Sequence, residues 1–444
     1  MTLTQAVEFG AAAAAHLAHN EEESDGESSL PDNQSNGHAE SSLNGHASIE
    51  KRDRTTVGSE EEYDKCLPEW RARLRRKLIR IVNRESILIG ALQRKIHNPL
   101  LDLYFTYSSI LGTDYFFILS LPMFFFFGYD DLGRGLLIIL GIGGYMSVFL
   151  KDLICSPRPF SPPVQRLNVL NHHMEYGFPS THTVHCSSIV LYFCLSIPTL
   201  STTSSFLLGI YAFTITFGRI YLGMHTFTDV AVGLVVGTTS VTIQRLPITQ
   251  AVEASLFQGD GTLAQGLFQP RLWTLFTSFL ATLELIPMPM DDCPCYDDAV
   301  LSGAVALGAL LGRSALGKPG LKVLKGSEIM PGSGWAYSDA QGWTEVPPNA
   351  VVWWGAACAK MIIGIFIVFL WRAAVKAVMK RIWRSVQLPA KIVKGVGGKA
   401  VFRQRMDTYT KVIVYTGIAV LSCDVTPLVF AKLGLGIQSW PSSH

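Results

Sequence analysis

Apolar stretches long enough to cross a membrane recur along the chain from Pro99 onward. A helix needs roughly 20 residues to cross a hydrocarbon core, and backbone polar groups in lipid must bond to one another, so each stretch is expected to be helical. We therefore predict an all-α fold, a polytopic transmembrane helical bundle of about 8–10 spans. The candidate spans are residues 100–127, 135–154, 183–199, 204–222, 229–245, 272–290, 298–314, 350–371 and 409–433.

The first stretch contains a break at Gly112-Thr113-Asp114. It is therefore either one long span or a re-entrant pair of shorter helices. Residues 99–245 carry the motifs described below and are predicted to form the functional core. Residues 246–444 are predicted to add further transmembrane helices and a basic loop, because the segment 372–405 holds 10 basic and no acidic side chains.

The N-terminal part of the chain is polar and divides by charge. Residues 1–65 hold 14 acidic and 4 basic side chains without sustained periodicity, which predicts a disordered acidic tail. The start also lacks the pattern of a signal peptide. Residues 66–98 are predicted to form a basic amphipathic, membrane-proximal segment, since 71–95 hold 9 basic side chains and 1 acidic one. Such a helix either lies on an anionic membrane surface or caps the domain as a solvated helix.

Composition narrows the class of protein. Of 444 residues, 48% are hydrophobic and 16% are charged, with a formal net charge of +2. This excludes a dedicated nucleic-acid binder. Most of the 8 cysteines lie in or beside apolar stretches and are interpreted as core residues. Cys293 and Cys295 could form a disulfide or bind a metal, but the Cys-x-Cys pair has no second ligand pair and no nearby histidine, so we predict no metal and no cofactor.

Charged and imidazole side chains gather in three clusters at the ends of apolar stretches, where an ionisable group is costly and usually functional. The number of membrane crossings between the clusters places all three at one membrane face, so a single pocket can contain them. The clusters are Lys151-x6-Arg158-Pro159, Pro179-Ser180-Thr181-His182 and Arg219-x5-His225-x3-Asp229.

These residue types favour a phosphate ligand. Lys151, Arg158 and Arg219 supply three cations, and a helix that starts at Ser180 adds free N–H groups. His225, four residues before Asp229, is expected to share a helix face with that carboxylate and to act as a nucleophile. His182 is expected to protonate the leaving group. Each residue alone has a structural explanation, such as a snorkelling anchor, but the ordered set favours a site.

The three motifs together resemble the signature of the type 2 phosphatidic acid phosphatase superfamily. Thr181 stands where glycine is common in that family, and Gly218 stands where serine is frequent. The flanking sequence, including Glu175-Tyr176-Gly177-Phe178, is most similar to sphingosine-1-phosphate and long-chain-base-phosphate phosphatases. The resemblance implies catalytic roles for His182, His225 and Asp229. It also implies phosphate binding by Lys151, Arg158, Ser180, Thr181 and Arg219.

The resemblance further implies a metal-independent, multi-pass enzyme of the endoplasmic reticulum membrane, with its active site facing the lumen. Its substrates would be long-chain sphingoid base 1-phosphates, hydrolysed through a phosphohistidine intermediate. If the basic segment 71–95 is cytosolic and the site is lumenal, an odd number of membrane crossings must separate the segment from Lys151. The sequence offers two candidate spans between them. If that segment is lumenal instead, two crossings suffice.

Other interpretations remain open at the level of sequence. One is a broader lipid or polyprenyl phosphatase, and another is a transporter or scaffold that only binds a phosphate. Glu175, beside the second motif, is a candidate contact for a substrate ammonium group. His172, His173 and His185 lack a carboxylate at helical spacing and are interpreted as loop polar groups rather than substrate contacts.

Overall fold

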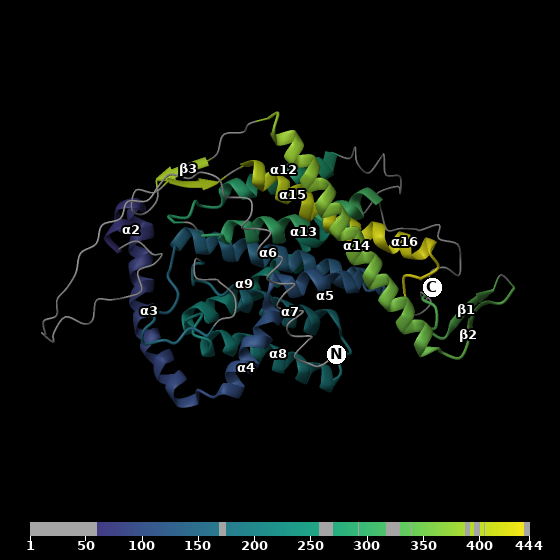
Figure 1. Ribbon diagram of the computed structural model, residues 1–444, viewed down its shortest axis with the longest axis horizontal. Coiled ribbons are helices and arrows are strands. Elements are labelled where there is room, and N and C mark those ends of the chain that lie inside the picture. The colour runs from purple at the N-terminus through teal and green to yellow at the C-terminus, as the bar shows by residue number, and fades with distance from the viewer. Residues whose placement is uncertain are drawn as a thin grey trace, which may run out of the picture. The chain divides into compact units, whose positions relative to one another are not determined.

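Helices occupy all the predicted apolar stretches in the computed structural model of the chain (Figure 1). The all-α class is confirmed, and the described strands form two short hairpins. The acidic tail through residue 59 and the pair His172 and His173 lie outside the described residues. The structure describes residues 60–167, 175–256, 270–291, 293–316, 329–338, 340–386, 391–394, 400–403 and 405–438.

The centre of the fold is α6 (Asp130–Ile154), which packs against α7 (Thr181–Ser196) and α9 (Phe227–Arg245) on one side and against α13 (Cys295–Leu316) on another. Glycines let α13 approach closely. A Cβ added at Gly144 would lie 2.6 Å from Ser302 Oγ, and one added at Gly141 would lie 2.5 Å from the Ala306 Cβ. Helix α8 (Thr202–Tyr221) completes this group beside α7.

The first apolar stretch is broken as the sequence predicts. It forms α4 (Pro99–Ser108), a 3₁₀ turn η1 (Ser109–Gly112) and α5 (Asp114–Phe126). Helix α4 lies beside α8, and α5 lies beside α6. The pair is bent by 53° at the break. A broken span and a re-entrant pair both fit this bend.

The predicted basic segment forms α3 (Glu69–Ile96), which docks on the end of α6. Arg71 donates hydrogen bonds to the carbonyl oxygens of Asp152 and Leu153 at 2.8 and 2.7 Å, and Arg75 donates to that of Cys155 at 3.1 Å. The last carbonyl groups of a helix have no partner within it, and cations near a helix C-terminus are favourable. These two arginines therefore cap α6 instead of facing a membrane.

A short helix α2 (Glu60–Cys66) precedes α3 and includes the last residues of the segment predicted as an acidic tail. Its Tyr63 is fully buried, and the Arg75 guanidinium lies 3.7 Å from the centre of the Tyr63 ring. Arg75 also pairs with Glu60 at 2.7 Å. Charge composition alone concealed this contact, because the buried tyrosine is a single apolar position among acidic neighbours.

Helix α3 lies on the face where α6 ends and α9 begins. The Glu85 carboxylate accepts hydrogen bonds from the Thr228 hydroxyl and backbone N–H at 2.6 and 3.0 Å, and the Gln93 amide donates to the Tyr221 carbonyl at 2.8 Å. These contacts and those of Arg71 and Arg75 place segment 71–95 at the end of the bundle that carries Lys151.

The C-terminal part packs against this core. The long helix α14 runs from Ala350 to Trp383, and it contacts α15. Two short antiparallel hairpins flank α14 in the chain, one with Trp335 opposite Glu345 and the other with Lys391 opposite Arg403. The remaining elements are α10 (Pro247–Leu256), α12 (Pro270–Leu285), β1 (Trp335–Ser338), β2 (Gly342–Glu345), β3 (Lys391–Lys394), β4 (Ala400–Arg403), α15 (Arg405–Val420), a π-helix η3 (Leu421–Val425) and α16 (Thr426–Lys432).

A buried ion-pair network joins this C-terminal part to α6 at the end opposite Lys151. Arg134 donates to the carboxylates of Asp424 in η3 and Asp130 at 2.6 and 2.9 Å. Arg313 of α13 donates to the other oxygen of Asp130 at 2.5 Å. The side chains of Arg134 and Asp424 are 4% and 1% exposed. Removing one partner from such a network would leave a buried charge uncompensated.

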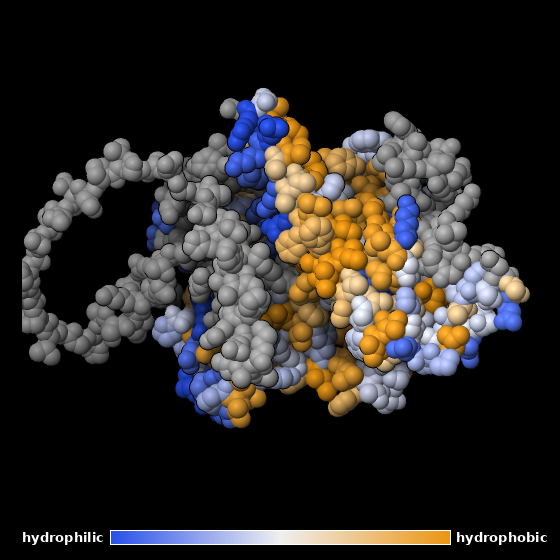
Figure 2. Space-filling view, turned by 45° about the vertical axis from the view of Figure 1, so that its right-hand side comes forward, coloured by the Kyte–Doolittle hydropathy of each residue, from blue (hydrophilic) through white to orange (hydrophobic). Residues whose placement is uncertain are grey.

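Five described helices are long and apolar enough to span a membrane, and the bent α4–α5 pair is a sixth candidate. Figure 2 shows a broad apolar surface on one face of the molecule. On α14, Ile362, Phe366 and Leu370 are 68%, 65% and 58% exposed, as expected for side chains that face lipid. Helices α7, α8 and α12 are shorter or less apolar, so the count of 8–10 spans stays a prediction. The five are Asp130–Ile154, Phe227–Arg245, Cys295–Ser314, Ala350–Trp383 and Arg405–Lys432.

Two neighbouring arginines of α3 test the capping role. Arg75→Ala removes a side chain that is 1% exposed and leaves the Cys155 carbonyl without its charged donor, so we expect a loss of about 1–3 kcal/mol of stability. Arg73, whose side chain is 66% exposed, is the matched control, and Arg73→Ala should cost less than about 0.5 kcal/mol. Thermal unfolding in detergent measures both, and equal losses would contradict the assignment.

Candidate active site

One pocket collects residues of all three predicted motifs. It is lined by Lys151 from the end of α6, by Arg158 from the following loop, and by residues from the start of α7 and the end of α8. The predicted residues that line it are Lys151, Arg158, Thr181, His182, Arg219 and His225. Ser180 and Asp229 are fully or almost fully buried at the starts of α7 and α9, behind this lining.

The cations of the pocket are buried and surround one carboxylate. Lys151, Arg158 and Arg219 are 2%, 5% and 4% exposed. The Glu175 carboxylate lies 3.5 Å from Lys151 Nζ and 3.0 Å from Arg158 Nη2. Among the described residues, Arg219 Nε has no hydrogen-bond partner. Three cations against the two carboxylates that line the pocket, Glu175 and Asp298, leave a positive excess that suits an anion.

Backbone carbonyl groups orient Arg158 within the cage. Its Nε donates to the Glu175 carbonyl oxygen at 3.1 Å, and its Nη1 donates to the Met224 carbonyl oxygen at 3.3 Å. The guanidinium therefore bridges the second and third motifs. A planar group held on two edges by backbone can present its remaining donors to phosphate oxygens in a fixed direction.

His225 is held by a partner that the sequence did not reveal. Its Nδ1 lies 2.8 Å from the carbonyl oxygen of Gly177, which can only accept, so Nδ1 carries the hydrogen and Nε2 keeps its lone pair. Asp229, the expected partner, lies 3.7 Å from Nδ1. Gly177 can approach because it has no side chain, since a Cβ there would lie 2.7 Å from the Pro157 carbonyl oxygen.

Asp229 acts mainly through the start of α9. Its carboxylate accepts a hydrogen bond from the Thr226 backbone at 2.8 Å, and its own N–H donates to the Thr226 hydroxyl at 3.1 Å. This is a capping box, with Thr226 as the N-cap. The expectation that His225 and Asp229 lie on one helix is therefore wrong, because His225 precedes the N-cap. The carbonyl of Asp229 also accepts from the Ser180 N–H at 3.1 Å.

The predicted helix start at the second motif is present, with Ser180 as the N-cap of α7 and His182 in its first turn. The Thr181 hydroxyl lies 2.9 Å from that of Ser147. His182 packs against the break between η1 and α5, where a Cβ added at Gly112 would lie only 2.7 Å from the imidazole Cδ2. The break thus makes room for the imidazole.

The electrostatic setting of His225 favours its neutral form. Burial, followed by the neighbouring Arg158 and Arg219 cations, holds the pKa of His225 well below its ordinary value. A neutral imidazole with a free Nε2 is the form that can attack a phosphorus atom. The same cations would stabilise the phosphate oxygens around it.

Five further residues line the pocket, and only some of them had a signal in the sequence. Gly112 and Thr113 were visible as a break, and Glu175 as a charge beside a motif. His185, interpreted as a loop polar group, lies within α7. Asp298 comes from α13, far along the chain, and had no signal. The five are Gly112, Thr113, Glu175, His185 and Asp298.

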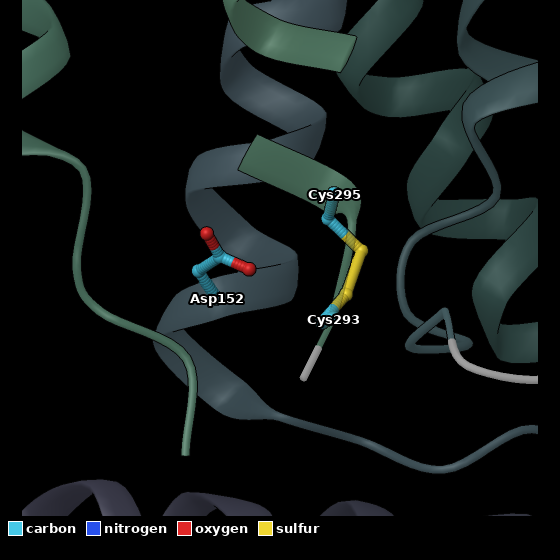
Figure 3. Close-up of side chains that lie close together, drawn as sticks. All are labelled: Asp152, Cys293 and Cys295. Carbon is cyan, nitrogen blue, oxygen red and sulfur yellow. A yellow bond between two sulfur atoms is a disulfide. The ribbon is translucent and has the colours of Figure 1, made fainter. Parts of the chain in front are cut away.

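Cys293 and Cys295 form a disulfide at the start of α13, beside the buried carboxylate of Asp152 (Figure 3). The sequence left a disulfide and a metal site open, and in the oxidised form both sulfurs are already bonded to each other. Asp152 adjoins Lys151 in α6, so the disulfide lies next to the cationic end of that helix. This places the start of α13 against the last turn of α6.

Comparison with known proteins agrees with this arrangement. Residues 133–246 match the family described as the PAP2 superfamily. The chain carries a PAP2 superfamily domain. The PAP2 domain runs from the first turn of α6 to the end of α9, so it includes all eight predicted site residues. Asp298, in α13, lies outside it.

Several curated proteins are similar to the chain. The dihydrosphingosine 1-phosphate phosphatase YSR3 of Saccharomyces cerevisiae is 34% identical over 259 residues, or 56% of this chain and 61% of that protein. The dihydrosphingosine 1-phosphate phosphatase C823.11 of Schizosaccharomyces pombe is 35% identical, over 54% of this chain and 59% of its own. Mouse sphingosine-1-phosphate phosphatase 1 is 28% identical, over 65% of this chain and 62% of that protein. The match thus spans about three fifths of each of these relatives.

A solved structure also matches the chain. The crystal structure of Aquifex aeolicus LpxE shares 28% sequence identity with it, over 35% of this chain and 92% of that one, with a TM-score of 0.31.

A change at Gly112 tests the contact with His182. Gly112→Ala places a methyl group against the imidazole and should displace it, lowering the rate of phosphate release about 10- to 100-fold. Gly209 of α8 is the matched control, since a Cβ there meets nothing within 4 Å. Gly209→Ala should therefore leave the rate unchanged. Equal rates in wild type and Gly112→Ala would contradict the role of this contact.

The lowered pKa of His225 predicts how stability depends on pH. An unfolded chain protonates a histidine near pH 6.5, whereas folded His225 takes up its proton only at lower pH, so stability falls as the pH drops below about 6.5. His225→Asn keeps an N–H donor for the Gly177 carbonyl but does not titrate. Its Tm should therefore fall less between about pH 7 and pH 5 than that of the wild type. Parallel falls would refute the lowered pKa.

Proposed function

We propose that the chain hydrolyses long-chain sphingoid base 1-phosphates to the free base and orthophosphate. The observation that carries the proposal is the pocket in which Lys151, Arg158 and Arg219 surround His225, whose Nδ1 is held by Gly177. Binding a phosphate would need the cations alone. A neutral imidazole with a fixed tautomer at their centre adds the means to attack the phosphorus, which favours an enzyme over a transporter or scaffold.

The proposed reaction has two steps. In the first, His225 Nε2 attacks the phosphorus, the bond from phosphorus to the ester oxygen breaks, and His182 gives a proton to the leaving alkoxide. In the second, His182 takes a proton from water, the resulting hydroxide attacks the phosphohistidine, and the phosphorus–nitrogen bond breaks. Orthophosphate leaves and both histidines return to their starting states.

The surrounding residues have distinct parts in this scheme. Lys151, Arg158 and Arg219 neutralise the phosphate oxygens as charge builds up in each step. Asp229 is a positioning residue, since it closes the start of α9 and lies 3.7 Å from His225 Nδ1, where it favours the positive charge that His225 gains on attack. The Glu175 carboxylate has to leave the cations when a phosphate enters.

The sphingoid substrate class is supported by the relatives in yeasts and mouse, whose names specify sphingosine or dihydrosphingosine 1-phosphate. A pocket at the ends of apolar helices also suits a phosphate with a lipid-soluble leaving group. We place the protein in the endoplasmic reticulum membrane, with the pocket and α3 both on the lumenal side. A broader lipid or polyprenyl phosphatase is the alternative, since the phosphate cage would be the same.

Phosphate release by the purified protein in the presence of a chelator tests the mechanism. His182→Ala and His225→Ala should each lower the rate at least about 100-fold. His97→Ala, which removes an imidazole that is 44% exposed and outside the pocket, is the matched control and should retain the wild-type rate. Loss of wild-type activity in the chelator, or an active His225→Ala variant, would refute the proposed mechanism.

A further inference from the structure

The pocket has a second acidic side chain that the PAP2 domain does not supply. Asp298, in the first turn of α13, lines the same pocket as Lys151 and His225. It lies more than fifty residues beyond the end of the PAP2 match at residue 246. Binding a phosphate does not need a further carboxylate in the pocket. The negative charge of such a carboxylate weakens the positive potential that attracts the anion.

The start of α13 is fixed firmly against the pocket. The carboxylate of Asp291, in the loop before α13, accepts hydrogen bonds from the hydroxyls of Tyr63 and Tyr176. Tyr176 directly follows Glu175, so this loop is tied to the second motif. One turn into α13, Ser302 donates to the Asp298 carbonyl oxygen at 2.7 Å. Asp298 therefore lies on a helix start whose preceding loop is hydrogen-bonded to α2 and to the second motif.

A buried imidazole completes this side of the pocket. His185 of α7 is 4% exposed, it lines the pocket, and among the described residues its Nε2 has no hydrogen-bond partner. A Cβ added at Gly144 would lie 3.6 Å from His185 Nε2 and 2.6 Å from Ser302 Oγ, so α7 and α13 meet at this point of α6. A buried polar atom without a partner is costly, and Nε2 is thus able to accept a hydrogen bond from a ligand in the pocket.

The two carboxylates of the pocket differ in their surroundings. Glu175 is paired with Lys151 and Arg158, so its charge balances the cage when no phosphate is bound. Asp298 comes from another helix, α13, and lines the same pocket as His185. A zwitterionic ligand, with a phosphate in the cage and a cation a few bonds away, would satisfy both ends of such a pocket.

We infer that Asp298 and His185 form a subsite for the ammonium group of an amino-alcohol phosphate. The inference rests on the proposed function and identifies the residues that would select its substrate class. The ammonium would pair with the Asp298 carboxylate and donate to His185 Nε2, while the phosphate lies between Arg158 and Arg219. A glycerol phosphate lipid has no cation to donate to His185 Nε2 or to pair with the Asp298 carboxylate.

The test compares sphingosine 1-phosphate with its N-acetyl derivative, which has the same tail and phosphate but no positive charge. The wild type should prefer the free amine in kcat/KM. In Asp298→Asn this preference should fall about 10- to 100-fold, because a hydrogen bond to a charged group is lost for only one of the two substrates. His185→Leu should lower it in the same direction.

Asp297 offers the matched control, because it is the adjacent carboxylate in α13 but is 52% exposed and pairs with Lys411 at 2.7 Å. Asp297→Asn should keep the wild-type preference. Inhibition by orthovanadate, which carries no amine, should be unchanged or tighter in Asp298→Asn, which shows that the phosphate cage is intact.

The outcomes separate this inference from the proposed function. An unchanged preference in Asp298→Asn, an equal loss for both substrates, or a loss of preference in Glu175→Gln alone would overturn the subsite. A wild type that hydrolyses both substrates without preference would overturn it too. If the wild type releases phosphate from neither substrate, the proposed function fails instead.

Discussion

The burial of three cations at the ends of apolar helices is the constraint on which the rest of the site depends. Moving one such charge out of water costs several kcal/mol, so each must find a compensating partner. In the described structure Lys151 and Arg158 share the Glu175 carboxylate, and Arg158 also donates to two backbone carbonyl groups. The cage therefore remains folded without a phosphate, and a phosphate can enter it by replacing one carboxylate.

This constraint extends to the helices that carry the cations. Lys151 lies in the last turn of α6, where unpaired carbonyl groups and the helix dipole would attract its ammonium group back toward the backbone. Arg71 and Arg75 of α3 occupy those carbonyl groups instead. Helix α3 thus leaves Lys151 available to the pocket, and its contacts to Thr228 and Tyr221 hold the third motif against the first.

The features that depend on local pattern could be predicted from the sequence. Apolar length located the helices, and the spacing of Lys151, Arg158, His182 and His225 located the pocket. Contacts that depend on how distant segments pack could not be predicted in this way. The hydrogen bond from His225 to Gly177 needs a loop that approaches through a glycine, and the entry of Asp298 needs α13 to lie along α6.

The same distinction explains the error about Asp229. Four-residue spacing is a helical signal, but Thr226 is a strong N-cap, and it starts α9 after His225 instead of before it. The carboxylate then closes the helix start and acts on the imidazole from 3.7 Å, while a carbonyl oxygen fixes the tautomer. A carbonyl oxygen carries only a partial charge, so it holds the ring in position without raising its proton affinity as a carboxylate contact would. Nε2 is therefore kept neutral for attack, and Asp229 lies close enough to stabilise the charge that follows.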